Sequence, residues 1–154
     1  MRRFIGVLCS QWAWWVAMVV AAGLLAAGCG TGELRTVPLT ASRTPFVRDI
    51  PVPMSFELVD DLSQSYRTQS HRVIRHAYFG QAEPITAYAF YKEQMPQSGW
   101  RFVSESNVEG TYQITFEKGS EVATVQIQRE TRGLRAGALV TVRVKPIGAL
   151  IGPN

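Results

Sequence analysis

The sequence predicts an α+β domain in which a single antiparallel sheet of about five to seven strands carries one α-helix on one face. Residues 110–118, 121–130 and 140–145 alternate apolar and polar side chains with the period of two that is typical of half-buried strands. Residues 83–97 are the best helical segment. We expect two or three strands, the helix and then four strands, and this order does not interleave helices with strands as a parallel sheet would require.

The chain begins with a charged Met1-Arg2-Arg3 and a long apolar stretch from Phe4 to Ala27, and polar sequence starts after Gly28-Cys29. Such a segment is typical of a secretory signal, and we expect residues 1–28 to be removed between Gly28 and Cys29. The small residues before Cys29 resemble the lipobox of bacterial lipoproteins. That resemblance implies acyl chains on Cys29, export and a membrane anchor, with the outer membrane favoured over the inner one because Gly30 replaces the Asp typical of inner-membrane retention.

An uncleaved transmembrane anchor is the competing interpretation of this N-terminal segment. The run from Phe4 to Ala27 has 24 residues, and about 20 apolar residues are enough to cross a bilayer. Both interpretations place the remaining chain outside the cytoplasm.

Removal of residues 1–28 from the 154-residue chain leaves one domain and a tether, with 14 basic side chains against 12 acidic ones. A net charge of about +2 gives little support for a nucleic-acid partner. Cys9 would leave with the signal and Cys29 would be acylated, so the mature domain is expected to hold no disulfide and no Cys-ligated metal. No cofactor is expected other than the covalent lipid.

We predict that residues 29–45 form the lipidated end and a flexible tether, residues 46–148 the globular domain and residues 149–154 a tail. Within the domain, residues 56–59 and 71–79 are expected strands, and residues 60–70 between them a turn or a weak strand.

The helix over residues 83–97 has Pro84 at its first position, where the missing N–H costs nothing, and Gly99 suits the residue that ends it. Its expected buried stripe consists of Ile85, Tyr88, Ala89 and Met95. A strand over residues 100–106 is expected to follow. A Gly119-Ser120 hairpin then connects two strands, and Arg132 to Gly137 is expected to be a mobile loop.

Basic side chains near the C-terminal end form a candidate interaction patch for anionic headgroups, an acidic glycan or an envelope protein: Arg129, Arg132, Arg135, Arg143 and Lys145. Protection of sheet edges by charged side chains is the competing explanation.

No catalytic, cofactor-binding or metal-binding residue stands out. His71 and His76 would point to opposite faces of one strand, so they cannot share a metal, and either is a surface histidine or a lone base or pH sensor. The aromatic side chains of Tyr88, Tyr91, Trp100 and Phe102 either line a ligand groove or fill the seam between helix and sheet.

A second resemblance rests on Ile50-Pro51-Val52-Pro53, on the stretch from Phe90 to Trp100 and on Phe116-Glu117-Lys118-Gly119. These motifs are similar to those of a family of small bacterial envelope lipoproteins, and the resemblance implies the fold and the envelope location without an activity. We therefore expect a non-catalytic binding or scaffolding module at a membrane surface. A small cell-wall-directed enzyme and a carrier of apolar ligands are the alternatives.

Overall fold

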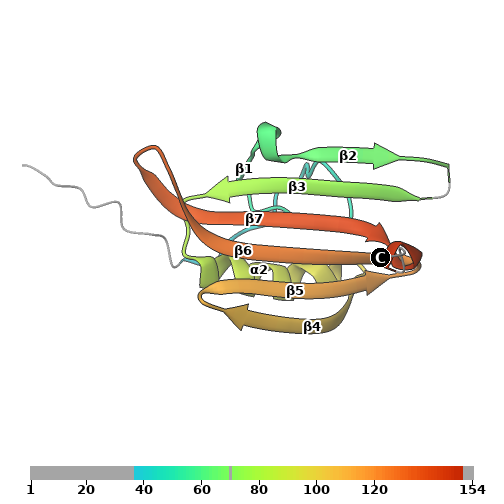
Figure 1. Cartoon of the computed structure of the whole chain (residues 1–154). Helices are drawn as coiled ribbons and strands as arrows, with labels where there is room; N and C mark the ends of the chain where they lie inside the picture. The colour runs from blue at the N-terminus through green and yellow to red at the C-terminus, as the bar shows by residue number, and fades with distance from the viewer. Residues whose placement is uncertain (1–36, 70, 151–154) are drawn as a thin grey trace, which may run out of the picture. The chain divides into compact units, whose positions relative to one another are not determined.

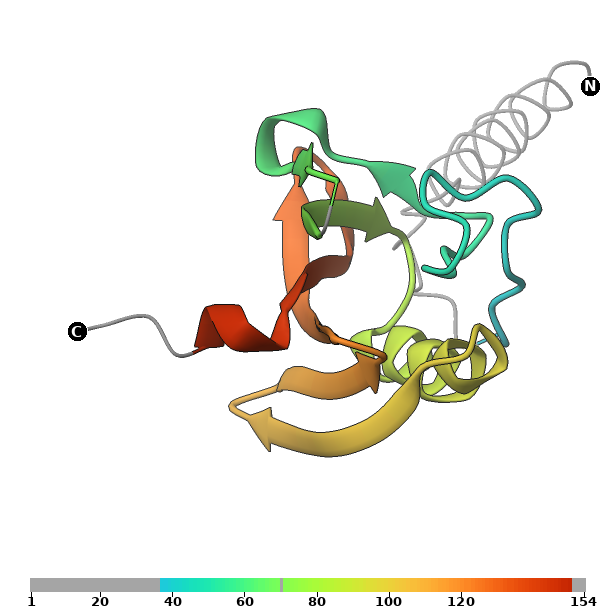
Figure 2. The ribbon, with the colours of Figure 1, turned by 90° about the vertical axis from the view of Figure 1, so that its right-hand side faces the viewer.

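The computed structural model describes residues 37–69 and 71–150. They form a seven-stranded antiparallel sheet with one α-helix packed against one face, which confirms the predicted fold class (Figures 1 and 2). The predicted signal segment, its cleavage site at Gly28 and the lipid-bearing Cys29 lie outside the described residues. Within the described ranges, no helix is both long and apolar enough to span a bilayer.

Three strands precede the helix and four follow it, as expected. The elements are β1 (Glu57–Leu58), η1 (Asp60–Leu62), β2 (Gln64–Arg67), β3 (Arg72–Gly80), α2 (Pro84–Gln97), β4 (Arg101–Val108), β5 (Thr111–Lys118), β6 (Glu121–Arg132), β7 (Arg135–Pro146) and η2 (Ile147–Leu150). The order across the sheet is β1-β3-β7-β6-β5-β4, with β2 also paired to β3. The first long strand therefore lies beside the last one.

The face of the sheet toward α2, called here the inner face, holds most of the core. On β5, the predicted alternation places Ile114 and Phe116 inside, and both are fully buried. The opposite, outer face has a small apolar cluster of Val59, Ala77, Phe79 and Leu139. Apart from these residues and the buried Val122, the outer face is mostly polar or exposed, so only one side of the sheet is fully covered.

The buried stripe of α2 differs from the expected one. Its buried residues are Pro84, Ala87, Phe90, Tyr91 and Met95. Ile85, which was expected inside, is 50% exposed. The stripe that contacts the sheet begins at Pro84 itself, one residue before the position chosen from hydrophobicity alone.

α2 ends at Gln97, two residues before Gly99, as the sequence predicts. Gly99 has a φ of 87°, its N–H donates to the carbonyl of Pro96, and the N–H of Trp100 donates to the carbonyl of Met95. This is the pair of bonds of a Schellman motif, which satisfies carbonyls that the last helical turn leaves free.

The prediction of a mobile loop from Arg132 to Gly137 is wrong. β6 runs to Arg132 and β7 starts at Arg135, so a two-residue turn at Gly133 and Leu134 joins them. Gly137 lies within β7 so close to β3 that an added Cβ would be 2.2 Å from the carbonyl oxygen of Gly80. The glycines that suggested a loop instead allow a tight turn and close strand contact.

Part of the segment expected to be a tether, residues 29–45, packs on the domain. Ala41 forms a β-bridge with Pro53, and the N–H of Ser42 donates to the carbonyl of Val52. Leu39 and Val47 contact the core cluster. Figure 2 shows this segment on the same side of the sheet as α2, so it adds cover that one helix alone cannot provide.

Candidate functional site

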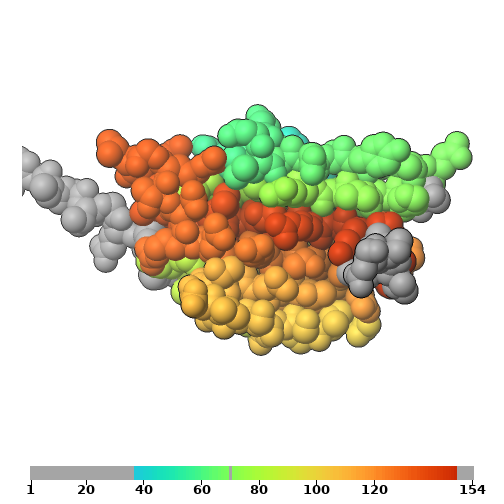
Figure 3. Space-filling view, in the orientation of Figure 1, coloured from blue at the N-terminus to red at the C-terminus, as the bar shows by residue number. Residues whose placement is uncertain are grey.

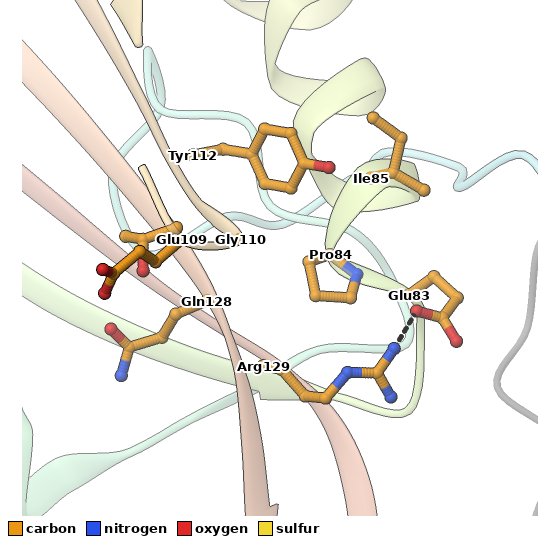
Figure 4. A pocket seen from close by; sticks show the side chains of 9 residues that line it. Glu83, Pro84, Ile85, Glu109, Gly110, Tyr112, Gln128 and Arg129 are labelled. Carbon is orange, nitrogen blue, oxygen red and sulfur yellow. Dashed lines mark hydrogen bonds and ion pairs between the residues drawn. The ribbon is translucent and has the colours of Figure 1, made fainter. Parts of the chain in front are cut away.

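A groove of about 480 Å³ opens where the N-terminus of α2 meets the β4–β5 turn and the end of β6 (Figure 4). The helix contributes Glu83, Pro84 and Ile85, the turn contributes Glu109 to Tyr112, and β6 contributes Gln128 and Arg129. Volumes of this size are typical of small-molecule sites. The lining combines an aromatic ring and apolar carbons with carboxylate, amide and guanidinium groups.

Tyr112 forms the aromatic side of the groove, and its ring packs against that of Tyr88 on α2. Its ring lies 5.1 Å from that of Tyr88, centroid to centroid. The Tyr88 hydroxyl donates to Glu105 at 2.6 Å, and the Lys92 ammonium donates to both the hydroxyl and the carboxylate. The bond from Tyr88, followed by that from Lys92, lowers the pKa of Glu105. This network ties α2 to β4 and positions the ring pair.

Glu109 lies at the edge of the groove in an unusual backbone conformation. Its φ is 49° and that of Gly110 is 79°, so both central residues of the β4–β5 hairpin turn are left-handed. Asn-Gly or Gly-Gly is the usual choice for such a turn. A Glu there costs on the order of 1 kcal/mol of strain, and Figure 4 shows its carboxylate beside Gln128.

Arg129 and Glu83 form the polar wall opposite the turn, through an ion pair drawn as a dashed line in Figure 4. Glu83 is the residue before the first turn of α2, yet its side chain makes no capping bond to the helix. The pair crosses from β6 to α2, and 58% of the Arg129 side chain is exposed. Its remaining N–H groups therefore face water and are available to a ligand.

A second hollow of about 380 Å³ lies between the N-terminal segment and the β2–β3 hairpin. Phe46, Ile74 and His76 line it. His76 is buried, its Nδ1 lies 3.0 Å from the Tyr78 hydroxyl, and burial lowers its pKa. β3 starts at Arg72, so His71 precedes the strand, and the expectation that both histidines lie on one strand is wrong.

An ion-pair network that was not predicted from the sequence lies around Arg72, at the start of β3. Arg72 donates to both oxygens of Asp49, at 2.9 and 2.6 Å, and to both oxygens of Glu121, at 2.9 and 2.8 Å. Lys118 reaches Asp49 at 3.3 Å, and the indole of Trp100 donates to the Asp49 carbonyl. The bonds from Arg72 hold the pKa of Asp49 at about 2. The network fastens the N-terminal segment to β3 and β6.

The predicted basic patch is not one surface. Arg129 lies on the inner side, in the groove, and pairs with Glu83. Arg132 lies 4.0 Å from Asp61, and the guanidinium of Arg135 lies over the Phe79 ring at 6.0 Å. Arg143 is eight residues further along β7, a separation of roughly 27 Å in a strand. Sequence spacing could not reveal that the β6–β7 hairpin separates these charges.

The aromatic residues that were expected either to line a groove or to fill the core do not all have the same role. Tyr91 and Trp100 are fully buried and fill the seam between α2 and the sheet. Tyr88 supports the groove through Tyr112, which the sequence interpretation did not include. Within the described residues, no group of three or more His, Cys, Asp or Glu side chains is arranged to hold a metal ion.

Comparison with protein families gives a match to a family model described as START domain-like, over residues 63–146. The matched region runs from the residue before β2 to the end of β7 and so includes α2 and all the strands that form the groove. No curated protein and no solved structure gives a significant match.

Proposed function

The chain belongs to the START domain-like family, and we propose that it is an envelope lipoprotein, anchored to a membrane through Cys29, whose domain is a non-catalytic binding module. The groove at the N-terminus of α2 is the proposed ligand site. Its volume, its opening to solvent and its mixed lining are the observation that carries the proposal.

The lining favours a ligand with both apolar and hydroxylated faces, and we propose a glycan chain. The Tyr112 ring and the carbons of Pro84 and Ile85 suit the C–H face of a sugar. The groups of Gln128 and Arg129 suit its hydroxyls, because one supplies both donors and acceptors and the other supplies donors in a fixed fork.

The packing of the domain supports surface binding over the carrier alternative. Trp100, Tyr91 and Phe116 are fully buried where α2 meets the inner face. A carrier would need an enclosed apolar space there, and these side chains occupy it.

The binding test uses the full-length acylated protein in detergent, titrated by calorimetry with soluble fragments of cell-wall glycan. We expect saturable binding that weakens at least about tenfold, or by about 1.4 kcal/mol, in Tyr112→Ala, because this variant removes the aromatic ring on which the apolar face of the sugar would pack. Gln128→Ala should weaken binding less and leave the fold intact. Tyr66→Ala removes an exposed ring on β2, outside this groove, and serves as the matched control.

Two outcomes would contradict the proposal. Equal affinities for the wild type, Tyr112→Ala and Gln128→Ala would place the ligand elsewhere. Conversion of the glycan by the purified protein, abolished by Glu109→Gln, would favour the enzyme alternative. The anchor has a separate test: Cys29→Ala should abolish labelling by a radioactive fatty acid.

A further inference from the structure

Three cations lie together on the outer face at the centre of the sheet. Arg75 on β3 is directly opposite Arg143 on β7, and Lys145 follows two residues later on the same face. Figure 3 shows that face, with β3 and β7 side by side between β2 and β6. Arg75 and Arg143 are exposed and Lys145 is partly exposed. Among residues 37–69 and 71–148, none of the three makes an ion pair.

Six other basic side chains of the domain reach a carboxylate: Arg72, Lys92, Arg101, Lys118, Arg129 and Arg132. Arg43, Arg48, Arg67 and Arg135 reach none among the described residues, so the three cations here differ from them in lying together on one face of the sheet. Glu117 on β5 also points to the outer face, but it bonds to Arg101 on the side away from β7. Arg75, Arg143 and Lys145 therefore remain without a counter-charge among the described residues.

Like charges that face each other across an antiparallel pair are destabilising. The Arg75–Arg143 pair thus slightly lowers the stability of the isolated domain. A layer of anions above the pair would remove the repulsion. The surface is complementary to a partner with closely spaced negative charges.

Apolar side chains border the same cations. Tyr66 on β2 is directly opposite Val73 on β3, and they are 66% and 43% exposed. Val73 precedes Arg75 by two residues and shares its face. Tyrosine next to basic side chains is typical of the interfacial layer of a bilayer, where rings and charges both find favourable contacts.

Distance favours a membrane over a remote partner, on the basis of the proposed anchor at Cys29. Leu39 is the first described residue that packs on the domain, so nine residues, 30–38, separate it from that anchor. Nine residues span at most about 32 Å even when fully extended. A surface of the domain must therefore stay close to the headgroups.

We propose that the face formed by Tyr66, Val73, Arg75, Arg143 and Lys145 rests on the anionic headgroup layer of the membrane that holds the lipid anchor. Each basic side chain near an anionic surface is attracted to it. Because the N-terminal segment packs on the inner side of the sheet, the tether must pass the edge of the sheet to reach the lipid. Contact through the outer face then directs the groove at the N-terminus of α2 away from the membrane.

A fluorescent label at residue 73 tests this orientation. Cys9 is removed and Cys29 is acylated in the proposed mature protein, so Val73→Cys supplies one reactive thiol. The acylated full-length protein is reconstituted in vesicles of phosphatidylcholine alone or with phosphatidylglycerol. We expect a blue shift of the dye emission only with phosphatidylglycerol, and its loss in high salt. A label at Glu93→Cys, on the exposed side of α2, should not shift.

Charge variants assign the effect to this face. Arg75→Gln with Arg143→Gln should abolish the blue shift, whereas Lys92→Gln with Arg101→Gln removes as much charge from paired sites and should preserve it. An unshifted residue-73 label in anionic vesicles, or equal effects of the two double variants, would overturn the proposal.

Flotation of the same samples with the vesicles distinguishes the proposed orientation from the proposed lipid anchor at Cys29. Retention on both vesicle types without a label shift contradicts only the orientation. Flotation with anionic vesicles alone, abolished by the Arg75/Arg143 variant, supports the face and contradicts the anchor. Flotation with neither contradicts both.

Discussion

Arg72 and Arg75 lie three residues apart on one strand, yet the two faces of the sheet give them opposite surroundings. Arg72 is on the inner side, largely buried, between the carboxylates of Asp49 and Glu121. Arg75 is on the outer side, exposed, opposite another arginine. The difference shows that nearby positions of one strand can differ completely in their partners, because alternate residues lie on a covered and on a solvated face.

The physical reason is desolvation. A guanidinium taken out of water loses hydration that only charged, well-oriented acceptors can replace. Four hydrogen bonds from Arg72 to two carboxylates do this. Water solvates Arg75 directly, so that side chain is available to a partner. The inner network stabilises the domain, and the outer face can serve recognition.

Breaking the inner network should give the largest change in stability. Arg72→Ala leaves Asp49 and Glu121 close together without their shared cation, and we expect a loss of about 3 kcal/mol in the free energy of unfolding. Urea denaturation measures it. Arg72→Lys keeps the charge without the planar fork and should lose less. A loss below about 1 kcal/mol for Arg72→Ala would show that the network is effectively solvated.

Acid should weaken the same network through Asp49. Its pKa is lowered from 3.8 to about 2, first of all by the hydrogen bond from Arg72. A carboxyl group with a lowered pKa stabilises the fold fully above its unfolded pKa, and this stabilisation is lost as the pH falls from about 4 toward 2. Urea midpoints measured across that range should fall less steeply in Asp49→Asn. Parallel slopes for the two proteins would contradict the assignment.

Local patterns in the sequence were sufficient to predict the framework. Alternation predicted β5 and β6, Gly119 predicted the hairpin between them, and Pro84 and Gly99 bounded α2. Each of these signals depends on neighbours within a few residues, where backbone sterics and side-chain period act directly.

Contacts between residues that are far apart in the sequence could not be predicted in this way. Asp49 and Arg72 are 23 positions apart, and Arg72 and Glu121 are 49 apart. The groove joins Glu83 to Arg129 across 46 positions. The separation of Arg129 from Arg143 was hidden for the same reason, since hairpin geometry and strand register decide which charges meet. Arg75 was outside the predicted set.

The inner face also holds a polar atom without a partner, and removing it should stabilise the protein. The Tyr91 hydroxyl is buried and makes no hydrogen bond to any described residue, and burial raises its pKa. Tyr91→Phe should therefore gain up to about 1 kcal/mol, because an unsatisfied buried hydroxyl is unfavourable. Tyr78→Phe, which removes the contact with His76, is the matched control and should lose a similar amount. A loss in Tyr91→Phe measured by thermal denaturation would indicate a buried water bound to that hydroxyl.

Removing a charge from the outer face should change the free energy of unfolding least. The change should have the opposite sign to that caused by Arg72→Ala. Arg75→Gln relieves the cross-strand repulsion with Arg143 and breaks no ion pair in the described part of the chain, so we expect a gain of about 0.2–0.5 kcal/mol. The gain should shrink as salt rises, because exposed charges are screened. Urea denaturation at low and high ionic strength measures both effects, with Thr141→Gln on the same face of β7 as the neutral control. A clear loss of stability in Arg75→Gln would mean that this arginine is held by contacts like those of Arg72, and the two faces would then not differ in the way proposed.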